Sequence, residues 1–205
     1  MLQWAKRRLG DDRKRRDIDE ARFVVLDLET TGLDVQRDRM ISAAAVGVEA
    51  GTIRLDDLLD LRVRSAVPIT RESIPVHGLF EGDVKDGLEP DAAVARIDAF
   101  VDDAVVVGHH IRFDIEVLDR PRGRPRRWLS MDTGRLAIRL EHGPTPGYVE
   151  VEPPSLDALA RDLGVAVRGR HTAAGDVLVT AEAFLVLLGR AKAKGLRTVG
   201  DLVRR

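Results

Sequence analysis

The chain has 205 residues, of which 44% are hydrophobic, enough to bury one substantial core in a single domain. Its formal net charge is −1, a balance that neither favours nor excludes a nucleic-acid partner. The sequence has no cysteine, which excludes disulfides and thiolate metal sites. Any metal must therefore be held by oxygen or imidazole, which favours magnesium or manganese over structural zinc.

The first third of the chain has the pattern of consecutive strands. Residues 22–28 form a short apolar run typical of a buried strand, and residues 40–50 and 58–64 predict two more, with a turn at 49–52. Short connections between consecutive strands favour antiparallel pairing. Residues 68–75 are predicted to form a loop.

The remainder of the chain alternates helices and strands. The predicted elements are a helix opened by Pro90, a strand at 104–107, a helix at 111–118, a strand at 128–131, a helix capped by Asp132 that runs to 140, a loop at 143–154, a helix capped by Ser155 and ended by Gly164, and a long helix at 172–188. The sequence therefore predicts an α/β fold in which helices flank a mixed sheet, antiparallel first and then parallel.

Two carboxylates, Asp27 and Glu29, lie one residue apart at the end of the first predicted strand. Side chains two positions apart in a strand project from the same face, so both charges must share one small space. Like charges in such a space raise one pKa sharply unless a divalent cation compensates them. The pair predicts a hard-metal site, with residues 30–32 forming the turn after it.

Further candidates lie at the starts of two predicted helices. Asp114 follows the strand at 104–107, and Asp176 lies in the first turns of the long helix, five positions after His171. One short segment thus supplies both a metal-binding carboxylate and a base. Each residue alone has an ordinary explanation, because acids are favoured near helix N-termini and most histidines are structural. Their occurrence together with Asp27 and Glu29 indicates a catalytic site.

Three motifs carry a resemblance to a known family. They are Asp-Leu-Glu-Thr-Thr-Gly-Leu at 27–33, Gly-His-His-Ile-Arg-Phe-Asp at 108–114 and His-Thr-Ala-Ala-Gly-Asp at 171–176, with weaker matches at 76–79, 132–133 and 155–159. In order and spacing the chain resembles the DnaQ-like branch of the DEDD 3'-5' exonucleases, the form with a catalytic histidine, and is similar to the proofreading subunit of bacterial DNA polymerase III. The resemblance runs from residue 22 to residue 188.

The resemblance implies a ribonuclease-H-like fold and a metal-dependent phosphodiester hydrolase. Two divalent ions, Mg²⁺ or Mn²⁺, would be held by four carboxylates, those of Asp27, Glu29, Asp114 and Asp176. His171 would deprotonate the attacking water, and the product would be a nucleoside 5'-monophosphate released from a 3' end.

The resemblance also implies a pocket for the terminal nucleotide. Its expected lining is Thr30, Thr31, Leu33, Val76, His77 and Phe113. Phe113 could equally belong to the core. One departure is visible: the second motif of the family usually has asparagine where this chain has His110, which we expect to support the loop rather than bind metal.

Two basic segments have open interpretations. Five arginines lie between Arg120 and Arg127, and we slightly favour contact with a polynucleotide backbone over a solvated basic loop. In the basic N-terminal segment, Leu2, Trp4 and Leu9 are spaced for an amphipathic helix that docks on the body or on a protein partner.

We expect a basic N-terminal extension at residues 1–21, an exonuclease domain at 22–190 and a short helical C-terminal extension at 191–205. The first 22 residues lack the apolar core of a signal peptide, and no stretch approaches the about 18 apolar residues of a membrane helix, so a cytoplasmic protein is expected.

The expected partner is a single-stranded 3' end, of DNA rather than RNA. An exoribonuclease acting on short RNA is the alternative within the enzyme class. A noncatalytic nucleic-acid-binding or adaptor domain is the alternative of another class, and the presence of all four carboxylates and His171 favours the enzyme.

Overall fold

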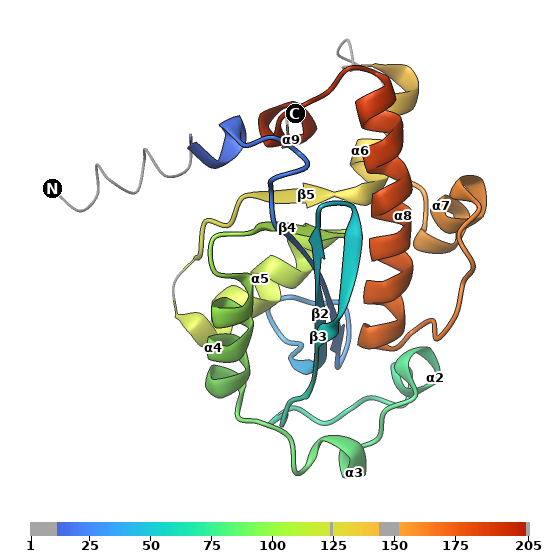
Figure 1. Cartoon of the computed structure of the whole chain (residues 1–205). Helices are drawn as coiled ribbons and strands as arrows, with labels where there is room; N and C mark the ends of the chain where they lie inside the picture. Colours follow the sequence, from blue (N-terminus) through green and yellow to red (C-terminus); the bar gives the residue numbers. More distant parts are fainter. Residues whose placement is uncertain (1–11, 124, 144–151, 204–205) are drawn as a thin grey trace, which may run out of the picture.

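The structure is a computed structural model that describes residues 12–123, 125–143 and 152–203. A five-stranded sheet lies at its centre, with strand order β3-β2-β1-β4-β5 (Figure 1). The strands are β1 (Phe23–Thr30), β2 (Met40–Glu49), β3 (Thr52–Arg62), β4 (Val105–Gly108) and β5 (Ser130–Asp132). Pairing is antiparallel from β3 to β1 and parallel from β1 to β5, which confirms the predicted mixed sheet.

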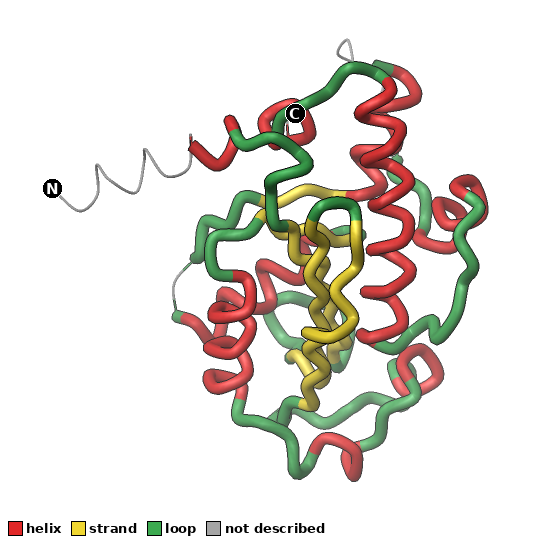
Figure 2. Tube along the Cα trace, viewed as in Figure 1, coloured by secondary structure: helices red, strands yellow, loops and turns green. Residues whose placement is uncertain are grey.

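Helices cover both faces of the sheet, as the colours of Figure 2 show. They are α2 (Ile74–His77), α3 (Glu81–Val84), α4 (Pro90–Val101), α5 (Ile111–Arg122), α6 (Thr133–His142), α7 (Leu156–Leu163), α8 (Ala173–Ala193) and α9 (Val199–Val203). Helices α4 and α5 share one core with the sheet, and α6, α8 and α9 share the core on the other face.

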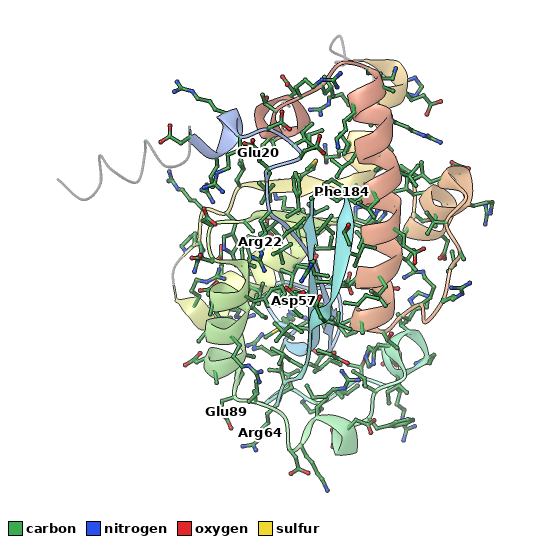
Figure 3. All side chains as sticks on the ribbon, viewed as in Figure 1. Glu20, Arg22, Asp57, Arg64, Glu89 and Phe184 are labelled. Carbon is green, nitrogen blue, oxygen red and sulfur yellow. The ribbon has the colours of Figure 1, made fainter. Side chains whose placement is uncertain are left out.

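The alternation of side chains along β1 assigns its residues to the two cores. Val24 and Leu26 belong to the core beneath α4 and α5, whereas Phe23 and Val25 face α8. The ring of Phe23 meets that of Phe184 edge to face, with centroids 5.0 Å apart, and Figure 3 labels Phe184 on α8. The same period of two places Asp27 and Glu29 on the face toward α8.

The predicted element boundaries need several corrections. β1 continues to Thr30 rather than 28, so that Glu29 belongs to the regular strand. β3 begins at Thr52 rather than 58, because the early part of this edge strand is exposed and its charged side chains break the apolar pattern. Helices α5 and α8 extend beyond their predicted ends at 118 and 188.

The predicted caps of the shorter helices are confirmed. Asp132 accepts a hydrogen bond from the Arg135 amide at 3.0 Å, and Ser155 accepts one from the Ala158 amide at 3.3 Å. Gly164 ends α7 in the left-handed conformation, with a φ of 72°. Most of the loop predicted at 143–154 lies outside the described residues.

Three of the five arginines between Arg120 and Arg127 make contacts within the protein, and the nucleic-acid contact that we favoured for this segment stays a prediction. The side chain of Arg122 is 7% exposed, pairs with Asp98 at 2.7 Å and also with Asp119, and stacks on Trp128 with 4.8 Å to the ring centroid. Arg126 pairs with Asp98 at 3.1 Å. Arg120 donates to the backbone carbonyl of Val35 at 3.2 Å. These arginines are engaged in tertiary contacts, which sequence composition does not reveal.

The described parts of the two expected extensions pack on the body. Ile18, Val199 and Leu202 are buried in the same core as α8. The domain boundaries at 21 and 190 stay predictions, and the helix expected around Leu2, Trp4 and Leu9 lies outside the described residues. Among the described helices, none is long and apolar enough to span a membrane.

Candidate active site

Three carboxylates converge between β1 and the start of α8. Carboxylate oxygens of Asp27, Glu29 and Asp176 all lie within 4.8 Å of one another. Glu29 is 9% and Asp176 8% exposed. Asp27 and Glu29 reach this place through the alternation of β1, and Asp176 reaches it because α8 starts opposite the end of that strand.

A tight turn before α8 sets the position of Asp176. The Thr172 hydroxyl caps the helix by accepting from the Gly175 amide at 3.1 Å, and it donates to the Gly169 carbonyl at 2.7 Å. A Cβ on Gly175 would lie 1.8 Å from that carbonyl oxygen, so no other residue fits there without moving the turn. The turn is therefore clamped onto the helix start.

Asp114 approaches Asp27 from the other face of the sheet, outside the group of three acids whose oxygens lie within 4.8 Å of one another. Strand β4 pairs with β1 only from Phe23 to Val25, so the β1 backbone beyond that point has no strand neighbour on this side. Asp114, in the first turn of α5, accepts the Leu28 amide at 3.2 Å and is 5% exposed. This hydrogen bond occupies one of its oxygens and anchors the carboxylate beside Asp27.

The four acids repel one another in the metal-free protein. Burial, together with the charges of Asp114, Asp176 and Glu29, raises the pKa of Asp27 well above its usual range. Burial and Asp176 raise the pKa of Glu29 to about 7. Burial raises the pKa of Asp114 despite its hydrogen bond from Leu28. The site thus holds more negative charge than its surroundings compensate.

These residues fit a hard divalent cation. The donors are all carboxylate oxygens, the ligands that Mg²⁺ and Mn²⁺ prefer. Oxygens on opposite sides of an octahedral Mg²⁺ lie about 4 Å apart, so the spacing within 4.8 Å needs only small side-chain rotations. A cation would also ionise the acids whose pKa values are raised, because it favours their charged forms.

Two arginines beside the cluster were missed from the sequence. Arg170 pairs with both Asp157 and Asp176. Arg62 on β3 lies in line with Glu29 on β1, because both residues pair with Ser42 on the strand between them. The Arg62 guanidinium donates to the Ser42 hydroxyl at 2.9 Å. Both guanidinium groups lower the pKa of Glu29 against the effect of burial. Only the adjacency of Arg170 to His171 was a signal in the sequence.

His171 lies in the turn before α8 with an exposed side chain. Its backbone is left-handed, with a φ of 61°, and its amide donates to Asp176 Oδ1 at 3.3 Å. The structure therefore ties the predicted base to the carboxylate cluster through the main chain.

The departure at position 110 has a conformational explanation. His110 occupies the left-handed cap of α5, with φ 59° and ψ 30°. Asparagine is the side chain that best tolerates this conformation, and histidine is also enriched there, so the two residues serve the same turn. The ring of His110 packs edge to face on that of His109, with centroids 4.7 Å apart.

The six residues predicted to line a nucleotide pocket differ in exposure. Leu33 is 87% and Val76 52% exposed, so both are accessible. Thr30 is largely buried, and Phe113 is half-buried against the core under α4 and α5. The two remaining residues, Thr31 and His77, are buried.

Thr31 is fully buried and its hydroxyl donates to Asp38 at 2.8 Å, so its side chain holds the loop after β1, and its contact with a nucleotide stays a prediction. His77 Nδ1 accepts from the Leu79 amide at 3.0 Å, and burial lowers the pKa of this histidine. Its Nε2 is buried without a hydrogen-bond partner in the described part of the chain.

The raised pKa of Glu29 predicts a stability that depends on pH. Because the folded pKa of about 7 exceeds the ordinary 4.5, the folded state retains a proton that the unfolded state has lost. The contribution of Glu29 to the free energy of unfolding is therefore favourable below pH 4.5 and is lost as pH rises through 7. At about 1.4 kcal/mol per pKa unit, the loss amounts to a few kcal/mol.

The measurement is urea denaturation in chelator at pH 5 and pH 7.5. His77 and His109 have pKa values lowered by burial and act in the opposite direction, so the informative quantity is the difference from Glu29→Gln. We expect Glu29→Gln to be more stable than the unsubstituted chain at pH 7.5 and close to it at pH 5. An equal difference at both pH values would contradict the assigned titration.

Sequence comparison identifies the family. The profile of the RNase_T exonuclease family matches residues 24–184. The DNA polymerase III subunit epsilon-like protein of Rhodobacter capsulatus is 36% identical over 192 residues, which cover 91% of this chain and 26% of that protein. The DNA polymerase III subunit epsilon of Aquifex aeolicus is 31% identical over 178 residues, which cover 81% of this chain and 80% of that protein.

The chain spans a minor part of other relatives. The PolC-type DNA polymerase III of Thermotoga maritima is 28% identical over 207 residues, which cover 96% of this chain and 14% of that protein. The Rhodobacter capsulatus protein is thus about four times as long as the region that it shares with this chain, and the Thermotoga maritima protein about seven times as long.

Solved structures share the fold. Exonuclease I of E. coli in complex with a dT13 oligonucleotide has a TM-score of 0.71 at 18% identity, covering 86% of this chain and 43% of that chain. Exonuclease X in complex with 5' overhanging duplex DNA has a TM-score of 0.67 at 22% identity, covering 89% and 99%. The ribonuclease-H-like fold and the resemblance to DnaQ-like exonucleases are confirmed, and the chain belongs to the RNase_T exonuclease family.

Proposed function

We propose that the chain is a metal-dependent 3'-5' exonuclease that removes nucleoside 5'-monophosphates from nucleic acid, DNA rather than RNA. The observation that carries the proposal is the convergence of Asp27, Glu29 and Asp176 within 4.8 Å in a chain of an exonuclease family. An adaptor domain has no need of such a cluster, whose like charges oppose one another in the absence of a cation.

The four carboxylates have distinct tasks in this proposal. Asp27, Glu29 and Asp176 would bind the divalent ions directly, and Asp114 would contribute the oxygen that is not occupied by the Leu28 amide. Two bound Mg²⁺ or Mn²⁺ ions would supply activation of the attacking water and stabilisation of the leaving oxygen.

His171 would accept the proton of the attacking water. Its side chain is exposed and its amide donates to Asp176, which supports the proposal by keeping the backbone of His171 beside the cluster. Imidazole is the side chain best suited to proton transfer near neutral pH. Relay of the proton to bulk solvent is direct, because the ring lies at the surface.

The end of the nucleic acid would lie over the loop after β1 and over α2. Leu33 and Val76 offer exposed apolar surface that can pack against a base of any identity. The buried residues Thr31 and His77 would support this surface from below, and Phe113 would support it from the core side.

The preference for DNA comes from the comparisons. The relatives named above are DNA polymerase III proteins, and Exonuclease I and Exonuclease X were solved with single-stranded and 5' overhanging duplex DNA, respectively. We extend these DNA substrates to the present chain, with an exoribonuclease acting on short RNA as the second candidate.

The test uses four 5'-labelled substrates: single-stranded DNA, duplex DNA, RNA and a dinucleotide. Each is incubated with Mg²⁺, with Mn²⁺ or with chelator. We expect a ladder that shortens from the 3' end of single-stranded DNA and disappears with chelator. A ladder on RNA alone would establish the exoribonuclease instead, and the absence of metal-dependent products on every substrate would favour the noncatalytic binding domain.

A further inference from the structure

The side chain of Arg170 bridges two helices at the carboxylate cluster. Its Nε lies 2.6 Å from Asp157 Oδ1 on α7, and its Nη1 forms an ion pair with Asp176 Oδ1 on α8. The Arg170 side chain is 20% exposed and that of Asp176 11%, so the second pair is largely shielded from water. Shielding strengthens the attraction between the two charges.

The carboxylate that Arg170 binds is one of those expected to hold a metal. Asp176 belongs to the group whose oxygens lie within 4.8 Å of one another. Burial raises the pKa values of Asp27 and Glu29, and the positive charge of Arg170 offsets part of this rise at both residues. The one guanidinium of Arg170 therefore acts on all three acids and offsets part of their negative charge in the metal-free state.

The turn that carries Arg170 is rigidly placed. Gly169, immediately before Arg170, has a left-handed φ of 62°, and its carbonyl accepts a hydrogen bond from the Thr172 hydroxyl. The close approach of Gly169 to Gly175 holds the turn against the start of α8. Asp157 gives the guanidinium a second partner outside the cluster. Arg170 can therefore release Asp176 and remain bound to Asp157 without a change in the backbone.

We propose that Arg170 is a built-in counter-ion of the metal site, which neutralises Asp176 while no metal is bound and yields this carboxylate to an incoming divalent ion. The inference rests on the proposed function, because it takes the cluster to be a metal site. Its consequence is that metal binds more weakly than the carboxylates alone would allow, since each ion must displace a cation that is already present.

The test measures binding of Mn²⁺ alone, by calorimetry and by electron paramagnetic resonance, with no nucleic acid present. We expect Arg170→Gln to bind Mn²⁺ about tenfold more tightly, because a competing unit charge is removed, a change equivalent to about 1.4 kcal/mol. Arg170→Lys keeps the charge and should stay within about threefold of the unsubstituted chain.

The matched control is Arg64→Gln. Arg64 also pairs with a carboxylate, Glu89 at 2.5 Å, and Figure 3 labels this pair below α4. Its removal subtracts the same charge from the protein without touching Asp176, so Mn²⁺ affinity should not change. Far-ultraviolet circular dichroism and thermal unfolding in chelator establish that each variant is folded.

Unchanged or weaker Mn²⁺ binding in Arg170→Gln would overturn the inference and make Arg170 an orienting partner of Asp176. Equal tightening in Arg170→Lys would overturn it too, because the charge would then not be the cause. If the unsubstituted chain degrades DNA with metal while these affinities fail to shift, only the counter-ion role falls. If that chain binds no Mn²⁺ and degrades nothing, the proposed function falls with it.

Discussion

Replacing Asp27 by asparagine is expected to abolish nuclease activity and, at the same time, to stabilise the metal-free protein. The activity should fall by about 10³-fold or more, because a lost metal ligand removes several kcal/mol of charge stabilisation and each 1.36 kcal/mol is a factor of ten. Stability in chelator should rise, because burial and the neighbouring acids raise the pKa of Asp27 and oppose its ionisation.

Hydrolysis of single-stranded DNA with Mg²⁺ and urea denaturation in chelator measure the two effects. Asp57→Asn is the control, because Asp57 is an exposed acid of β3 that Figure 3 labels in front of the sheet. It should retain full activity, with stability changed by no more than about 0.5 kcal/mol. An Asp27→Asn protein that is less stable than the unsubstituted chain, or that still degrades DNA, would refute the assigned role.

Replacing His171 by asparagine is expected to slow turnover by about 10²–10⁴-fold, the usual contribution of a general base. Asparagine suits the left-handed backbone at φ 61°, so the turn and the amide hydrogen bond to Asp176 should persist. Mn²⁺ affinity should therefore remain within a few-fold of the original. The loss would lie in the turnover number, with metal binding retained.

Steady-state kinetics over pH 5–9 separates a lost base from a damaged site. Removal of the base should flatten the acidic limb of the pH profile, whereas damage to the metal site would weaken Mn²⁺ binding. His142→Asn is the matched control, because His142 lies at the exposed end of α6 and pairs only loosely with Glu141, at 3.9 Å. Full turnover by His171→Asn would assign the proton transfer to another group.

Local patterns were sufficient to predict most of the fold and the acidic cluster. Alternation along β1 placed Asp27 and Glu29 on one face, and the caps at Asp132 and Ser155 marked two helix starts, because each of these features depends on residues close in sequence. The change from antiparallel to parallel pairing followed from the short early connections and the later helical crossovers, whereas the order of the strands was not predicted.

Features that depend on distant partners could not be predicted in this way. Arg122 is a buried tertiary contact because Asp98 and Trp128 happen to lie beside it, and no local signal distinguishes it from a solvated arginine. The ion pair of Arg170 with Asp176 depends on the clamped turn and on α7. The anchor of Asp114 depends on where β4 stops pairing with β1.

The register of β1 has a consequence for how tolerant the chain is of insertions and deletions. A shift by one residue would turn Asp27 and Glu29 toward α4 and α5 and bring Leu26 and Leu28 to the position of the acids. Two charges would then be buried in an apolar core. The irregularity in pairing with β2 begins only between Glu29 and Thr30, beyond the last acid. A length change of one residue upstream in this strand is thus opposed by folding itself, because such a shift would remove the acidic cluster and disrupt the core together.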